Sequence, residues 1–147
     1  MTEFDNAVRM SVYRRFVETG EAPDAEDVSR ELGCSPEEVE AAFDRLAAER
    51  VLVLKPGTQE IRMAMPLSAV ETSFRVHVGE RSYWAPCIWD ALGIPAMLGA
   101  DARIATHYEE FEDPPDLRVT DGRLSWTDGV IHFAVPAARW WDDIGYT

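Results

Sequence analysis

Helix start and stop signals follow one another closely through residues 1–50, and they restrict what this part of the chain can fold into. Apolar residues recur at helical spacing between Phe4 and Thr19, and the polar segment TGEAPDAED then ends that helix and begins another. A second helix is predicted from about Asp24 to Leu32, with Gly33 as its stop. A third begins in CSPEEVEAAFDRLAAERV, where Ser35 and Glu38 form a capping box around a proline at the first helical position.

The next segment, VLVLKPGTQEIRMAM, is expected to form two short strands around a Pro-Gly turn. Three helices followed by a hairpin are typical of a winged helix, so we predict a winged-helix-like domain over residues 1–67. Many winged helices bind DNA, but the third helix here is rich in Asp and Glu, and the whole chain has a net charge of −13. We therefore do not expect DNA as a partner and interpret this domain as a packing module; a winged-helix regulator remains an alternative.

A second domain is predicted for residues 68–147, after a joint marked by Pro66 and Ser68. TSFRVHVGERSYWA alternates as a hairpin around Gly79-Glu80, and later segments supply further strands with turns at Asp121-Gly122 and Asp128-Gly129. Between them lies an apolar stretch that predicts a short buried helix broken by Gly93 and Pro95. The fold class is therefore α+β, with a three-helix unit preceding a mostly antiparallel sheet.

The sequence also indicates in which cell compartment the protein works and whether its cysteines are reduced. No apolar run approaches the roughly 20 residues that span a bilayer, and MTEFDNAVRM lacks the order of charges and apolar residues found in a signal peptide. We expect a cytoplasmic protein with no membrane partner. Two cysteines, Cys34 and Cys87, are then expected to remain thiols.

Cys87 and Asp90 are the candidate catalytic residues. With Pro86 at the first helical position, Cys87 falls in the first turn, where free amide groups and the helix dipole favour the thiolate. Asp90 lies three positions later on the same helical face, so its carboxyl group can exchange a proton with whatever the sulfur binds. Apolar neighbours would raise the pKa of that carboxyl group by desolvation. By spacing alone, a single cysteine on an apolar helix is more often an inert core residue, and Asp90 could be only a surface or hydrogen-bonded helix residue.

Other residues that could carry chemistry are interpreted as structural. Cys34 fits a turn. The histidines fall in separate predicted strands without the short spacing of a zinc site, namely His77, His107 and His132. The late tryptophans are interpreted as core or interface residues, namely Trp126, Trp140 and Trp141.

The stretch YWAPCIWDALGIPAMLGADARIATHY resembles the core signature of the organomercurial (alkylmercury) lyase family, in which a cysteine, two residues and an aspartate precede an apolar run with proline and glycine. A later HFAVP and the order of the two domains extend the resemblance to most of the chain. The resemblance implies cleavage of a carbon–mercury bond, with Cys87 matching the first catalytic cysteine and Asp90 the aspartate. Thiolates suit a soft metal, and a carboxylic acid can protonate the released carbon.

The chain departs from the family pattern at the second catalytic cysteine. The segment SWTDGVIHF, before the matching strand, contains no cysteine, and Asp128 falls near that place. A carboxylate is a hard ligand for mercury, and Asp128-Gly129 also fits a hairpin turn, so Asp128 is only a weak metal-ligand candidate. Tyr108 stands where the family has a further cysteine.

Three hypotheses follow. The first is an alkylmercury lyase-like enzyme that needs no bound cofactor but takes an external small thiol in place of the second cysteine. The second is a single-cysteine protein that binds a metal or a small hydrophobic ligand without cleaving it. The third is the winged-helix regulator. In the first two the partner is a small organometallic or metal ligand held by Cys87.

Overall fold

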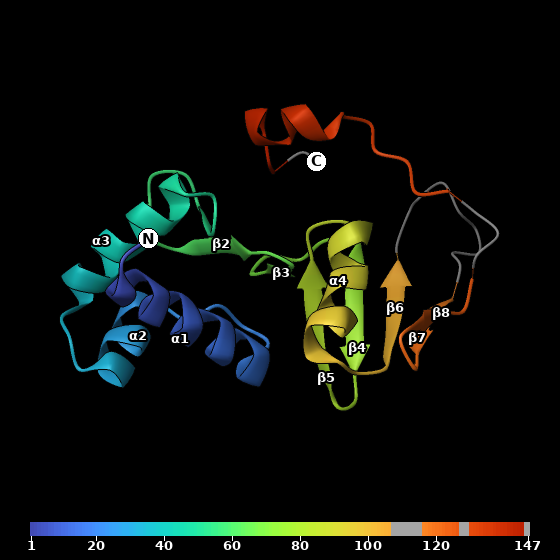
Figure 1. Ribbon diagram of the computed structural model, residues 1–147, viewed down its shortest axis with the longest axis horizontal. Helices are drawn as coiled ribbons and strands as arrows, with labels where there is room; N and C mark the ends of the chain where they lie inside the picture. Colours follow the sequence, from blue (N-terminus) through green and yellow to red (C-terminus); the bar gives the residue numbers. More distant parts are fainter. Residues whose placement is uncertain (107–115, 127–129, 146–147) are drawn as a thin grey trace. The chain divides into compact units, whose positions relative to one another are not determined.

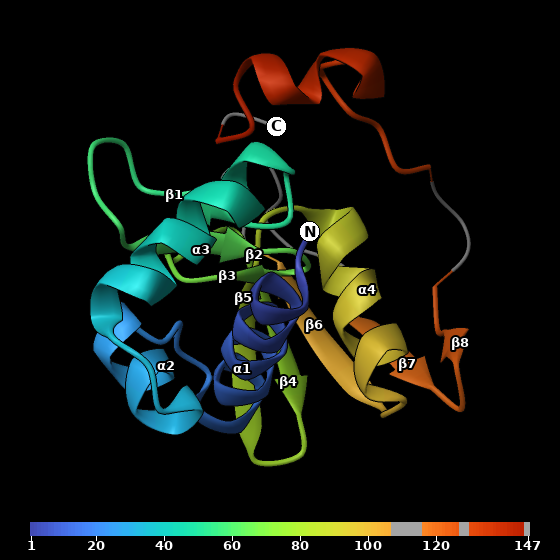
Figure 2. The ribbon, with the colours of Figure 1, turned by 60° about the vertical axis from the view of Figure 1, so that its left-hand side comes forward.

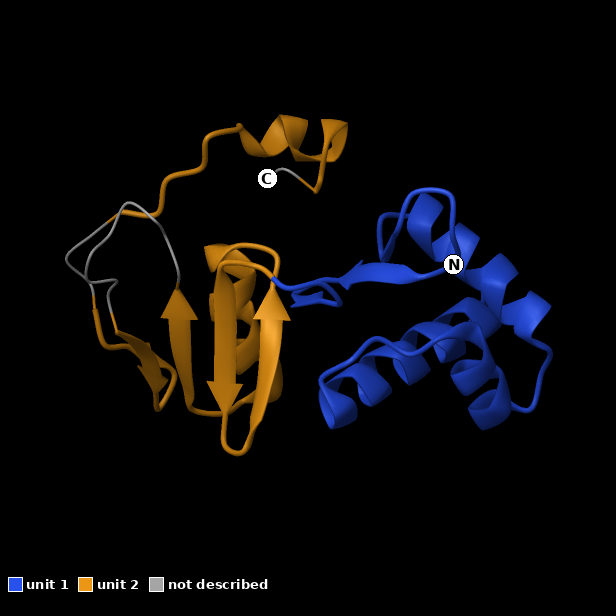
Figure 3. Ribbon diagram, turned by 180° about the vertical axis from the view of Figure 1, so that it is seen from behind, with its two compact units in different colours: residues 1–71 blue, residues 72–147 orange. Residues whose placement is uncertain are grey.

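The computed structural model describes residues 1–106, 116–126 and 130–145, and it divides the chain into two compact units, Met1–Glu71 and Thr72–Thr147 (Figure 1, Figure 3). The elements are helices and an antiparallel sheet, which confirms the predicted α+β class. The domain boundaries proposed from the sequence, 1–67 and 68–147, stay predictions. Each unit is described by itself.

Three helices form the first part of unit 1, as predicted: α1 (Glu3–Thr19), α2 (Ala25–Leu32) and α3 (Pro36–Ala48). The capping box of Ser35 and Glu38 is present, with Pro36 in the first turn, and Gly33 takes the left-handed conformation that ends α2. The helices enclose a fully buried apolar core drawn from all three of them, namely Val8, Val12, Phe16, Val28, Val39, Ala42, Phe43 and Leu46.

Three short strands complete unit 1: β1 (Val53–Leu54), β2 (Ile61–Ala64) and β3 (Leu67–Ser68). β2 pairs with both neighbours antiparallel, and the Pro-Gly turn lies between β1 and β2 as expected. This order of elements agrees with a winged helix, and the assignment to that class stays a prediction.

The exposed surface of α3 is acidic. Glu37, Glu38, Asp44 and Glu49 are exposed, while Arg45 is held by an ion pair with the buried carboxylate of Asp5, at 2.6 Å. Arg45 is therefore engaged within the unit, and acidic side chains predominate on this helix.

We expect this acidic helix to prevent DNA binding, because a phosphate backbone gains affinity only where cations replace its counterions. In a fluorescence anisotropy titration of mixed-sequence duplex DNA at low salt, no association should appear below the micromolar range. Tight binding that weakens steeply with added salt would instead support the regulator hypothesis.

Unit 2 is built on an antiparallel sheet. Its strands are β4 (Phe74–Val78), β5 (Arg81–Ala85), β6 (Ala102–Thr106), β7 (Leu117–Thr120) and β8 (Arg123–Leu124), in the order β5-β4-β6-β7-β8. The predicted hairpins at Gly79-Glu80 and Asp121-Gly122 are confirmed. Both turn residues of the second hairpin have positive φ, 50° at Asp121 and 70° at Gly122, as a tight turn of this kind requires.

One helix, α4 (Ile88–Leu98), packs against β4, β5 and β6 (Figure 2). The prediction that Gly93 and Pro95 break it is wrong, because the helix runs through both residues and ends at Gly99. Its inner side buries Ala91, Ile94 and Pro95, and this packing offsets the hydrogen bond that proline cannot donate. The helix is buried on one side only, since Trp89 and Met97 are 64% and 41% exposed.

The structure of residues 130–145 differs from the strand predicted there. Residues 130–136 form no strand, so the expected strand through His132 and HFAVP is wrong, and a 3-10 helix follows at Ala137–Asp142. Ile131 is 44% and Val130 93% exposed, so the segment lacks the buried face that would hold it in a sheet. Asp128-Gly129 and His107 lie outside the described residues.

In the part of the chain that the structure describes, no helix is long and apolar enough to cross a membrane.

The packing of α4 predicts an uneven response to truncation along the helix. Ile94 is fully buried, so Ile94→Ala should lower the free energy of unfolding by about 2–5 kcal/mol through lost burial and the cavity left behind. Met97→Ala on the exposed side is the matched control and should change it by less than about 0.5 kcal/mol. Urea unfolding of both variants checks this, and equal losses would contradict the placement of the helix.

Candidate functional site

Cys87 occupies the junction where the hairpin ends and α4 begins. It is the N-cap residue of the helix, with an extended backbone at φ −148° and ψ 178°, and its carbonyl accepts the first helical hydrogen bond from the Ala91 amide at 2.9 Å. The prediction that Pro86 is the first helical residue is therefore wrong, since the extended conformation of Cys87 lets the helix begin only at Ile88. The sulfur nevertheless lies at the helix amino terminus, as expected.

The side chains of Cys87 and Asp90 meet. The Cys87 thiol donates a hydrogen bond to Asp90 Oδ2, with 3.0 Å between sulfur and oxygen. A Ser or Asp at an N-cap accepts a hydrogen bond from the backbone, but the Cys87 side chain makes no such bond. Its proton is directed at the carboxylate instead, which is the contact that the spacing of the two residues predicted.

Desolvation controls the protonation of this pair. The pKa of Cys87 is raised to about 11, chiefly by burial; the Asp90 side chain adds to the rise, and the backbone of Asp90 and Trp89 partly opposes it. Burial also raises the pKa of Asp90, although the hydrogen bond from the thiol partly opposes this. At Cys87 desolvation therefore outweighs the helix terminus, and the sulfur is a thiol at neutral pH.

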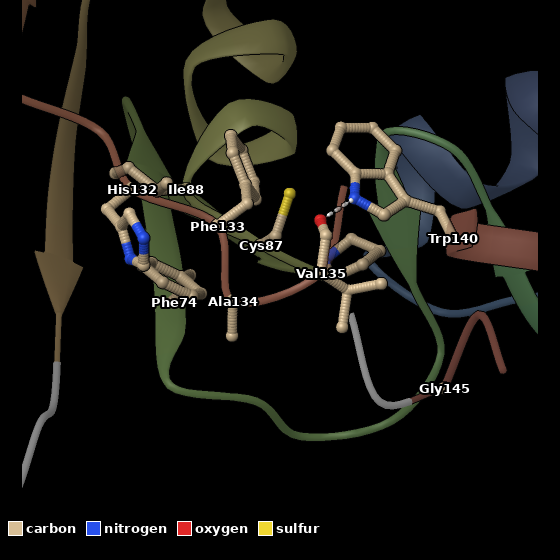
Figure 4. Close-up of a pocket in the computed structure, with 10 residues that line it drawn as sticks. Phe74, Cys87, Ile88, His132, Phe133, Ala134, Val135, Trp140 and Gly145 are labelled. Carbon is tan, nitrogen blue, oxygen red and sulfur yellow. Dashed lines mark hydrogen bonds between the residues drawn. The ribbon is translucent and has the colours of Figure 1, made fainter. Parts of the chain in front are cut away.

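A pocket of about 360 Å³ opens in front of Cys87 (Figure 4). Cys87 contributes from the N-cap of α4, Ile88 from its first turn and Phe74 from β4. The remaining walls come chiefly from the carboxyl-terminal segment, namely His132, Phe133, Ala134, Val135, Trp140 and Gly145. Of the polar pair, Cys87 lines this largely apolar and aromatic pocket, and Asp90 lies behind it in hydrogen-bond contact with the sulfur.

Sequence reasoning missed the part that the carboxyl-terminal segment plays in this pocket. His132 is exposed, in agreement with its prediction, and it also lines the pocket. Trp140, predicted as a core or interface residue, is half-buried and lines the pocket too. The signal that could have found them is HFAVP, which the family resemblance placed near the second cysteine. Trp126 is 44% exposed, so it is not a core residue.

Asp128 and Tyr108 lie outside the described residues, so their distance from Cys87 is not defined. Cys34 belongs to unit 1, and both cysteines are free thiols. Within residues 1–106, 116–126 and 130–145, no group of three or more His, Cys, Asp or Glu side chains could hold a metal ion. Cys87 and Asp90 are therefore the candidate site as the structure shows it.

Comparison with known proteins points to one family. The family model described as alkylmercury lyase matches residues 67–147, which is the stretch that contains Cys87, Asp90 and the pocket. Among solved structures, the chain is similar to the mercury-bound form of MerB2, with a TM-score of 0.66 and 23% sequence identity over 87% of this chain and 61% of that one. The chain thus spans less than two thirds of that protein. No curated protein matches.

The raised pKa of Cys87 predicts slow alkylation at neutral pH. In a Cys34→Ser background, the iodoacetamide reaction rate should keep rising to about pH 10 without levelling off, because the pKa is about 11. Asp90→Asn removes the negative charge and should shift the profile to lower pH, while burial keeps the midpoint above the ordinary value of about 8.5. Circular dichroism at each pH verifies folding. If the alkylation rate of the Cys34→Ser protein has its midpoint below about pH 8.5, the helix terminus outweighs burial in setting the pKa of Cys87.

Proposed function

The chain belongs to the alkylmercury lyase family, a family of lyases, and on that premise we propose that it cleaves carbon–mercury bonds by protonolysis with Cys87 and Asp90. The single observation that supports this most directly is the hydrogen bond from the Cys87 thiol to Asp90 Oδ2 at 3.0 Å. It joins a soft metal ligand to a proton carrier at the mouth of a pocket.

In the first step the sulfur takes up the mercury. An organomercurial reaches the site as a complex with a small thiol, and Cys87 replaces that thiol on the metal. As the sulfur–mercury bond forms, the thiol proton passes to Asp90, and the displaced thiolate leaves. The raised pKa of Asp90 favours its protonated form, so the carboxyl group retains this proton.

In the second step the carbon leaves as a hydrocarbon. Electron donation from sulfur makes the mercury-bound carbon more basic, and the Asp90 carboxylic acid protonates it. The electron pair of the carbon–mercury bond becomes the new carbon–hydrogen bond, so no oxidant or reductant is consumed. The products are the hydrocarbon, an Asp90 carboxylate and a mercuric ion on the Cys87 sulfur.

Release of the mercuric ion calls for further thiol. We propose that one small thiolate binds the metal as its second ligand, in the role that a second cysteine has in the family pattern. A second thiol molecule then displaces Cys87, returns a proton to its sulfur and carries the metal away. Small thiols of this kind are abundant in the reducing cytosol, which is where we expect the protein to work.

A second candidate function is binding of a mercurial without cleavage. It is favoured by the lack of a second cysteine near HFAVP and by the two-residue donor set of the described site. In this case Cys87 would hold the metal and Asp90 would only accept the thiol proton.

Hydrocarbon release separates the two functions. Purified protein with phenylmercury and excess small thiol should release benzene in repeated turnovers, measured by gas chromatography against thiol alone. Cys87→Ser should abolish turnover, and Asp90→Asn should lower the rate by about 10²–10⁴-fold, because the carbon loses its positioned acid. Cys34→Ser is the matched control and should retain full activity.

Binding of one mercurial per chain that is lost in Cys87→Ser, with no hydrocarbon above the thiol background, would support the binding protein and reject the lyase.

A further inference from the structure

The pocket at Cys87 shares part of its lining with a second, largely apolar space. A neighbouring groove of about 550 Å³ shares His132, Phe133, Val135 and Trp140 with that pocket and extends to Trp89 on the first turn of α4. The shared residues form a common wall, so a molecule held by the Cys87 sulfur lies beside side chains that also line the groove. The two spaces together far exceed the volume of a methyl group.

Aromatic side chains dominate the common wall. The rings of Phe133 and Trp140 lie with their centroids 5.0 Å apart at 52°, a tilted arrangement within the favourable range for aromatic pairs. Trp140 Nε1 donates a hydrogen bond to the Val135 carbonyl at 2.8 Å, as Figure 4 shows, so the polar edge of the indole is already satisfied. Its remaining surface is apolar.

Trp89 extends this surface into solvent. It is 64% exposed although it belongs to an apolar helix, and Ile131 across the groove is 44% exposed. Large apolar side chains that line a concave space beside a reactive group are typical of ligand sites. A ligand that covered them would gain free energy by removing their surface from water.

This inference rests on the proposed function. We propose that Phe133 and Trp140 of the common wall, together with Trp89 of the groove, form an aromatic wall that binds the organic substituent of the mercurial and makes the site selective for aryl over methyl compounds. Two-coordinate mercury places its ligands on opposite sides of the metal, so a mercurial held by Cys87 directs its carbon away from the sulfur. A phenyl group can then pack against the aromatic wall, whereas a methyl group leaves the wall in water.

Substitution of the wall tests the proposal. Because phenyl and methyl carbon–mercury bonds differ in intrinsic reactivity, the informative quantity is how each variant changes the ratio of kcat/KM for phenylmercury to that for methylmercury. Trp89→Ala and Phe133→Ala should each lower this ratio about tenfold, equivalent to about 1.4 kcal/mol, because phenylmercury loses more contact with the aromatic side chains than methylmercury does. Trp140→Phe retains an aromatic face and should lower it less.

Met97→Ala is the matched control, since Met97 is exposed on the same helix but lines neither space, and it should leave the ratio unchanged. Circular dichroism and urea unfolding confirm that each variant is folded. Phe133→Leu replaces Phe133→Ala if the latter is unstable.

A binding measurement separates this proposal from the lyase activity. In Asp90→Asn, which cannot protonate the carbon, competition against a small thiol gives the relative affinities for phenylmercury and methylmercury. Tighter phenylmercury binding that weakens with Trp89→Ala would support the aromatic wall even if the parent protein cleaves nothing. If the parent, Trp89→Ala and Phe133→Ala all cleave mercurials with the same ratio of kcat/KM for phenylmercury to that for methylmercury, the aromatic-wall proposal is wrong. The proposed lyase function would not be affected by that result.

Discussion

The packing of α4 on the β4–β5 hairpin is the constraint on which the rest of the site depends. Ile94 and Ala91 are fully buried on the inner side of the helix, and this fixes where the helix must begin relative to the end of β5. The chain has only Pro86 and Cys87 in which to change from strand to helix. Cys87 is therefore held at the helix amino terminus with an extended backbone, and Asp90, one turn later, can accept its proton.

That placement creates opposing effects on the thiol, and their balance explains the chemistry we propose. The helix terminus favours a thiolate, but burial and the charge of Asp90 raise the pKa of Cys87 to about 11. A free thiolate is therefore rare at neutral pH, and the sulfur reacts by losing its proton as it meets a metal. Asp90 is suited to receive that proton because burial raises its pKa as well. A pair that shares one proton needs no strong base nearby.

Much of this could be predicted from local sequence signals. The capping box of Ser35 and Glu38 and the turn at Asp121-Gly122 depend on neighbouring residues, and both are confirmed. Predictions that depended on tertiary packing were wrong: Pro95 is tolerated inside α4 because that side is buried, and the segment through His132 finds no strand partner. The contact of Cys87 with Asp90 was predictable because both residues lie on one helical turn, whereas the pocket wall comes from residues distant in sequence.

The carboxyl-terminal segment is also where this chain differs from the family pattern. A second cysteine would supply a soft ligand from the carboxyl-terminal segment, and this chain has aromatic and apolar side chains on the described part of that segment instead. Aromatic rings cannot replace a thiolate as a mercury ligand, but they can hold the organic group while a diffusing thiol supplies the sulfur. In the function we propose, binding of the substituent and binding of the metal therefore fall to different residues.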